Sequence, residues 1–187
     1  IVMVQIVKPA LEYLPSYQAA LERGWSPDNV RLMTATREEL AAIKKDPEAF
    51  LAGLDDPEAK GPPITLPDGS KVPRLPGFRR WIWDGEASGS IGLRWQPGTS
   101  ALPPHVLGHI GYSVVPWKQR RGYATEALRL MLAEARAVGL DHVELTTDPD
   151  NPASGKVILA NGGKLVRRFK KVAAYGDAES LLYRIDL

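Results

Sequence analysis

The chain has 187 residues, of which 44% are apolar and 25% charged, so it is long enough for one compact domain and unlike a disordered protein. Lysine and arginine number 24 against 22 acidic residues, and this near balance argues against a nucleic-acid-binding polycation. The absence of cysteine excludes disulfides, thiolate metal sites and a cysteine nucleophile; with neither a signal peptide nor an apolar run of roughly 20 residues, we expect a cytoplasmic protein without a membrane partner.

The chain is predicted to begin with a strand and a helix. Residues 2–7 form an apolar, β-branched run that is typical of a strand. Because Met3 stands so close to the start, residues 1 and 2 are either additions to the natural chain or part of a longer protein that continues upstream. A helix is expected from Pro9, with apolar residues three to four apart, and Gly24 is placed to end it.

A second helix and a long loop are expected before the central strands. Thr36 and Glu39 have the spacing of a capping box, so this helix is expected to begin at Thr36 and to be split by Pro47. Prolines between residues 60 and 77 exclude a regular ladder or helix and predict a surface loop, with a small hairpin at Asp68-Gly69. The loop is either a flexible connector or a cover for a site.

The rest of the chain alternates strands and helices. A tight turn at Asp84-Gly85 joins two strands, and a second loop rich in proline and glycine covers residues 96–108. The predicted strands are 78–83, 88–95, 109–115, 142–147, 164–173 and 180–187, and the predicted helices are 121–138 and 153–160. Helices early, antiparallel hairpins next and a β-α-β unit last imply one mixed α/β sheet.

A basic turn before the helix at 121–138 carries the clearest chemical signal. Pro116 ends the preceding strand, and the turn leads directly into a helix whose first N–H groups lack intrahelical partners. The helix dipole and the charges of Lys118, Arg120 and Arg121 make this turn suitable for phosphate or pyrophosphate. Gly122 removes a side chain where the anion must approach closely.

The turn lacks a Walker motif, and it also lacks the Gly-x-Gly-x-x-Gly fingerprint of dinucleotide-binding folds. Its pattern is instead Gln119-x-x-Gly122-x-Ala124. This pattern, between a strand and a helix, resembles the acyl-CoA loop of the GCN5-related N-acetyltransferase (GNAT) superfamily.

The surrounding sequence strengthens this resemblance. Asn151 and Ser154 resemble the Asn-x-x-Ser helix that reaches the cofactor in that family. The run from His109 to Tyr112 looks like a branch of bacterial predicted acetyltransferases. The resemblance covers residues 1–187 as a single GNAT-like domain and is strongest over 108–163.

The resemblance implies an α/β fold whose fourth and fifth strands splay apart, so that the pantetheine of acetyl-CoA pairs with the fourth strand. The acetyl group would pass by direct attack to the primary amine of a small molecule or peptide, without a covalent enzyme intermediate. Val114 and Val115 would offer backbone groups, and the Val115 amide would polarise the thioester oxygen. The residues that the resemblance assigns to acetyl-CoA are Val114, Val115, Gln119, Arg120, Arg121, Gly122, Tyr123, Ala124, Thr125, Asn151 and Ser154.

Proton transfer needs a base for the amine and an acid for the leaving thiolate. At the position where several family members carry a glutamate, this chain has His109, which is either a base with an ordinary pKa of about 6.5 or a structural histidine at a strand end. His105 and Glu86 are weaker alternatives. The family's tyrosine acid is missing from the short helix, so Tyr175 is the candidate acid, with solvent as the alternative and Tyr183 assigned to packing.

Two other functions remain open: a catalytically silent acyl-CoA-binding or regulatory domain, and an unrelated phosphate binder. Trp81 and Trp83 either line an acceptor pocket or, in the favoured interpretation, pack on the sheet. The basic run at 167–171 is interpreted as a solvated strand edge rather than a nucleic-acid surface. Three scattered histidines predict no metal site, and a homodimer is compatible with the sequence.

Overall fold

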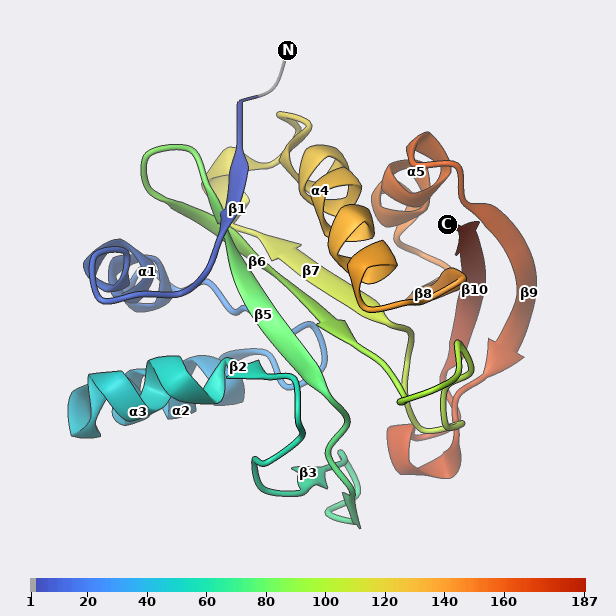
Figure 1. Ribbon diagram of the computed structural model, residues 1–187, viewed down its shortest axis with the longest axis horizontal. Helices are drawn as coiled ribbons and strands as arrows, with labels where there is room; N and C mark the ends of the chain where they lie inside the picture. The colour runs from blue at the N-terminus through green and yellow to red at the C-terminus, as the bar shows by residue number, and fades with distance from the viewer. Residues whose placement is uncertain (1–2) are drawn as a thin grey trace.

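The computed structural model describes residues 3–187, which form two main sheets with helices packed around them (Figure 1). The larger sheet consists of β1 (Gln5–Val7), β2 (Asp55–Asp56), β5 (Gly77–Trp83), β6 (Ala87–Arg94) and β7 (Ile110–Val114). The smaller sheet consists of β8 (His142–Thr147), β9 (Lys164–Lys170) and β10 (Glu179–Asp186). Their strand orders are β1–β5–β6–β7, with β2 also paired to β5, and β8–β10–β9.

The single mixed sheet expected from the sequence is wrong. Within the described residues, the strands of both sheets pair in antiparallel fashion. A β-α-β unit would place β7 and β8 side by side, but the recorded backbone pairing between them is a bridge of Gly108 with Leu145. The two strands therefore belong to different sheets, because their ladder does not continue past this bridge.

Residues 3–187 contain five helices (Figure 1). The helices before the central strands are α1 (Leu14–Glu22), α2 (Met33–Lys45) and α3 (Pro47–Gly53). The later helices are α4 (Tyr123–Ala137) and α5 (Pro152–Ala160). Of the five, α1 and α4 pack on the larger sheet, whereas α5 packs on α4 and β8 and lies beside the smaller sheet. Single 3₁₀ turns, η1 (Pro116–Lys118) and η2 (Ala173–Tyr175), complete the chain. In residues 3–187, no helix combines the length and the apolar character that a membrane crossing requires.

Each face of the larger sheet has its own hydrophobic core. The core beneath α4 and α5 is built from buried aliphatic residues, among them Ile82, Ile91, Ile110, Leu128, Met131, Val143, Leu145 and Ile158. In the core beneath α1 and α2, the ring of Trp81 stacks on Tyr17 with 4.2 Å between centroids. Trp83 packs against this second core, so the packing interpretation of both tryptophans is confirmed.

The start of α2 differs from the sequence prediction. The helix begins at Met33 after Leu32 at φ +48°, without a side-chain cap, so the expected capping box is wrong. The hydroxyl of Thr36 instead donates to the Trp25 carbonyl at 2.9 Å, and Glu39 accepts a hydrogen bond from Arg79 at 2.9 Å. Contacts with distant segments therefore override the local capping pattern.

Other local predictions are confirmed. Pro47 separates α2 from α3, with Asp46 accepting from the amide of Ala49 at 3.1 Å. The hairpin predicted at Asp68-Gly69 joins β3 (Ile64–Thr65) to β4 (Lys71–Val72). Of the predicted first strand, Gln5–Val7 is β1, and residue 2 lies outside the described residues.

Candidate functional site

The beginning of β7 is clasped to β8. The His109 amide donates to the Glu144 carbonyl at 2.7 Å, and the Glu144 amide donates back to Nδ1 of His109 at 2.8 Å. Gly108 has φ +95°, and a Cβ there would stand 2.9 Å from the Glu144 oxygen, so glycine is required. Nε of Arg94 donates to the Gly108 carbonyl at 2.8 Å. We call this junction the closed end of β7.

His109 is enclosed in this closed end. Its side chain is 0% exposed, and burial lowers its pKa to about 4, with a smaller contribution from His142. Because Nδ1 accepts from Glu144, the neutral ring carries its proton on Nε2, which has no hydrogen-bond partner among residues 3–187. This geometry favours the structural alternative over the base, whereas the base itself stays a prediction.

Tyr112, the third residue of β7, packs against the core beneath α4 and α5. Its hydroxyl shares a hydrogen bond of 2.8 Å with Oγ of Ser154, at the start of α5. Its backbone carbonyl accepts a hydrogen bond from Nδ2 of Asn29 at 2.9 Å, so this carbonyl points to the free edge of β7 and not toward β6. Burial raises the pKa of the Tyr112 phenol above its ordinary value, although the bond to Ser154 lowers it, so the hydroxyl keeps its proton at neutral pH.

A groove of about 360 Å³ lies between the end of β7 and the connection from α1 to α2. Ser113, Val114 and Gln119 line one side, and residues 24–33 supply most of the other. Nε1 of Trp25 donates to Oγ of Ser113 at 3.0 Å, which holds the connection against the strand. The groove therefore joins the exposed edge of β7 to the basic turn.

The basic turn itself has an unusual backbone. Arg120 has φ +62° and Gly122 has φ +80°, so two of its residues are left-handed. Gly122 is the N-cap of α4, and no side chain caps the helix. Arg120 and Arg121 are exposed. Free helix N–H groups beside two exposed guanidinium groups form a site suited to a phosphate anion.

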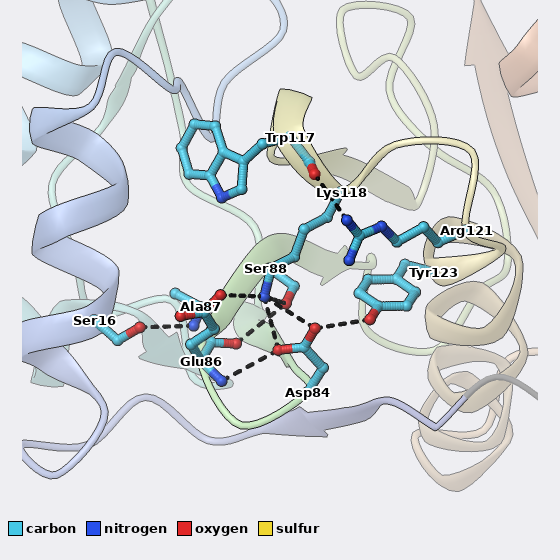
Figure 2. A network of polar contacts seen from close by, with 9 residues as sticks. All are labelled: Ser16, Asp84, Glu86, Ala87, Ser88, Trp117, Lys118, Arg121 and Tyr123. Carbon is cyan, nitrogen blue, oxygen red and sulfur yellow. Dashed lines mark hydrogen bonds and ion pairs between the residues drawn. The ribbon is translucent and has the colours of Figure 1, made fainter.

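Lys118 does not contribute to this anion site. Its side chain is 6% exposed and points inward, with its ammonium 2.8 and 2.9 Å from the Asp84 oxygens and 2.7 Å from Glu86 (Figure 2). Oγ of Ser88 lies 3.2 Å away. The prediction that Lys118 helps to bind the anion is therefore wrong, because its charge is neutralised within the protein. Glu86, the weaker alternative for the base, is the second partner of this ammonium.

Val115 and Tyr123 also differ from the expected picture. The Val115 amide donates to the Ser88 carbonyl at 3.0 Å, and the Val115 carbonyl accepts from the amide of Lys118 at 3.0 Å. The Val115 amide is therefore not free to polarise a thioester oxygen, contrary to the expectation, and the Val115 carbonyl already has a partner in Lys118. The Tyr123 hydroxyl donates to Asp84 at 2.7 Å, so its side chain points away from the turn and leaves its backbone N–H facing it.

The remaining predicted residues lie around the same space. Asn151 caps α5 by accepting from the Ser154 amide at 3.3 Å. Nδ2 of Asn161 donates to the Thr125 carbonyl at 3.1 Å and ties α5 to the first turn of α4, which also contains the half-buried Ala124. Asn161 was not among the predicted site residues. Its position before two glycines indicated only the end of a helix.

Tyr175 and Tyr183 occupy different environments. The Tyr175 hydroxyl donates to the His105 carbonyl at 2.9 Å. Burial raises the pKa of Tyr175, the Arg94 guanidinium lowers it and the Asp28 carboxylate raises it. Tyr183 is buried in the first core, as the packing interpretation predicted. The acid role of Tyr175 stays a prediction.

Comparison with known proteins decides the family. The family described as acetyltransferase (GNAT) domain matches residues 31–164, well over half of the chain. The chain belongs to the GNAT acetyltransferase family. It is therefore a member of a family of acyl-CoA-dependent N-acetyltransferases, and the unrelated phosphate binder loses its support. No curated protein sequence matches the chain significantly.

Solved structures share this GNAT fold. The microcin C7 self-immunity acetyltransferase MccE, in complex with acetyl-CoA and AMP, is 13% identical over 98% of this chain and 92% of its own, with a TM-score of 0.62. RimL, a ribosomal L7/L12 α-N-protein acetyltransferase in complex with CoA, is 14% identical over 100% and 96%, with a TM-score of 0.62. RimJ of Mycobacterium smegmatis, in complex with CoA-disulfide, is 18% identical over 98% and 81%, with a TM-score of 0.59. At these identities the likeness concerns the fold.

Proposed function

We propose that this GNAT protein transfers an acetyl group from acetyl-CoA directly to the primary amine of a small molecule or peptide. The observation that carries the proposal is the uncapped start of α4 beside the exposed Arg120 and Arg121. The diphosphate of CoA needs N–H donors and positive charge, and both are present there. Gly122 presents no side chain to the diphosphate, and Gln119 is one of the residues that line the groove.

The pantetheine is proposed to lie along the free edge of β7, where the sheet opens after the closed end. The Tyr112 carbonyl faces this edge and accepts from Asn29 there, which leaves its second lone pair for the pantetheine. Val114, two residues on, presents its backbone groups to the same side. Tyr112 and Val114 thus replace Val114 and Val115 in the role expected from the sequence. Ser154, which bonds to the Tyr112 hydroxyl, and Asn151, which caps the same helix, are proposed to contact the donor from the start of α5.

The acceptor amine is proposed to enter through the groove between Val114 and residues 24–33. Its nitrogen forms the new C–N bond, the C–S bond of the thioester breaks, and the electron pair leaves with the CoA sulfur. The Tyr112 hydroxyl, paired with Ser154, is placed to return a proton to that sulfur. The proton of the amine passes to solvent in this proposal, because His109 is enclosed.

One observation favours the second candidate, a catalytically silent acyl-CoA-binding domain. The histidine expected to act as a base is enclosed, and its Nδ1 already accepts a hydrogen bond. The two candidates share the donor site and differ in turnover. A single domain over residues 1–187, the cytoplasmic location and a homodimer stay predictions.

Ligand-induced stabilisation and thiol release test the proposal. Acetyl-CoA and CoA should raise the melting temperature of the wild type, because a ligand that binds the native state stabilises that state. ATP should not raise it. Gly122→Val, which forces a branched side chain into a left-handed position, should abolish this shift. Thiol release over a panel of amines should be detectable, and Tyr112→Phe should lower it about tenfold without changing the CoA-induced shift.

The outcomes separate the candidates. An absence of stabilisation by CoA would overturn the donor site. Stabilisation without turnover on any amine would favour the silent domain. Full turnover in Tyr112→Phe would remove this tyrosine from the mechanism but leave the transfer reaction in place.

A further inference from the structure

Two side chains on either side of the basic turn converge on one carboxylate, that of Asp84 in the β5–β6 hairpin (Figure 2). Lys118, just before the turn, donates to both of its oxygens at 2.8 and 2.9 Å. Tyr123, just after the turn, donates to one of them at 2.7 Å. The Glu86 amide adds a fourth hydrogen bond at 3.2 Å, which fixes the carboxylate itself.

This arrangement fixes both ends of the turn at residues 119–122. Between them Arg120 is held at φ +62°, a conformation that costs free energy and persists only where the surroundings impose it. Trp117 adds a third support, since the Arg23 guanidinium lies 3.8 Å from the centroid of its ring. Arg121 donates back to the Trp117 carbonyl at 3.3 Å, within the same unit.

The charges of the cluster have a matching consequence. An unpaired Asp84 would place a negative charge under a turn that is proposed to bind a diphosphate. The Lys118 ammonium neutralises the charge of Asp84, and both side chains are largely buried, at 6% and 14% exposure. The second carboxylate partner of Lys118, Glu86, is exposed, so water screens that remaining negative charge. The cluster therefore holds the turn without competing with the exposed arginines for the anion.

We infer that Asp84 is a positioning residue for the acyl donor, which preorganises the turn at residues 119–122 by binding Lys118 and Tyr123. Asp84 touches neither donor nor acceptor in this arrangement. It acts by keeping the N–H groups and arginines of the turn in the conformation that receives the diphosphate. The inference rests on the proposed function, since the ligand is the CoA of that proposal.

Three single variants of the full chain test the inference, with CoA affinity measured by calorimetry. Asp84→Asn should raise the Kd for CoA about tenfold, which is the effect expected if the turn keeps its binding conformation in only about a tenth of the molecules. Tyr123→Phe, which removes one hydroxyl, should raise it about threefold. Tyr17→Phe is the matched control, because Tyr17 also donates to a carboxylate that pairs with an arginine, yet in the core under α1. Its Kd should stay within about twofold of the wild type.

Amide hydrogen exchange in the free protein gives a second readout. Asp84→Asn should speed exchange at residues 119–125 and leave β8 and β10 unchanged, which a general loss of stability would not do. Unchanged exchange at 119–125 would overturn the inference, whether or not CoA binds. A wild-type Kd in Asp84→Asn, where the wild type binds CoA, would overturn it as well. If Asp84→Asn does not fold, Tyr123→Phe decides by the same two measurements.

A wild type that does not bind CoA is a different result. It would overturn the proposed function and, with it, the role of Asp84 in donor binding. Exchange at residues 119–125 would then still report whether Asp84 orders the turn, so the two failures can be told apart.

Discussion

The two ends of β7 use polar groups in opposite ways. At the closed end, the backbone and the buried side chain of His109 both bond to Glu144, and the Gly108 carbonyl accepts from Arg94. At the other end, the first N–H groups of α4 and the side chains of Arg120 and Arg121 face solvent. The buried ammonium of Lys118 pairs with Asp84. The difference teaches that polar groups at the closed end should determine stability, whereas those at the open end should determine ligand affinity.

The largest effect should come from His109→Ala. The substitution leaves a cavity and an unpaired Glu144 amide, so we expect a loss of about 4 kcal/mol in the free energy of unfolding. Urea denaturation measures this loss. CoA affinity of the folded protein should change little, and a variant of wild-type stability that no longer binds CoA would contradict the comparison.

The second effect concerns pH at the closed end. The folded pKa of His109 is lowered to about 4 from 6.5, so the unfolded chain binds a proton that the folded protein rejects. Stability is therefore fully present above pH 6.5 and is lost as the pH falls toward 4, by about 3 kcal/mol. Urea denaturation across this range should show the loss in the wild type. It should be absent from His109→Asn, whose side-chain oxygen can still accept from Glu144.

A smaller pH effect belongs to the open end. Partial burial alone would raise the pKa of Asp84, but hydrogen bonds from Lys118 and Tyr123 lower it to about 2. Its contribution is present above pH 4 and is lost as the pH falls from about 4 to about 2. Because water screens this cluster in part, we expect about 1 kcal/mol. The difference in unfolding free energy between wild type and Asp84→Asn should shrink over this range, and a constant difference would contradict the assignment.

Local signals accounted for much of the fold. The break at Pro47 and the Asp68-Gly69 hairpin each depend on residues within one turn of the chain. The order of strands and helices from residue 77 onward follows the hydrophobic patterns for the same reason. The sheet was predicted less well, since no local pattern reveals that contact between the two strand segments stops at the bridge of Gly108 with Leu145 and that β7 and β8 then separate into two sheets.

The candidate site divides along the same line. The left-handed Gly122 before an uncapped helix was predictable, because glycine and the turn lie together in the sequence. The inward direction of Lys118 was not, because its partner Asp84 lies 34 residues earlier. Tyr112 was missed as a site residue, although strand alternation places its side chain on the face of β7 opposite to that of His109. Attention to that second face would have found it.

The stacking of Arg23 on Trp117 has a practical consequence. Indole emission depends on the groups that contact the ring. Trp117 lies two residues before the turn at residues 119–122, which is proposed to bind the donor. Motion of the turn should therefore alter intrinsic fluorescence, with no label attached. The chain has five tryptophans, so subtracting the spectrum of Trp117→Phe would isolate this one. The protein thus carries its own optical probe of donor binding.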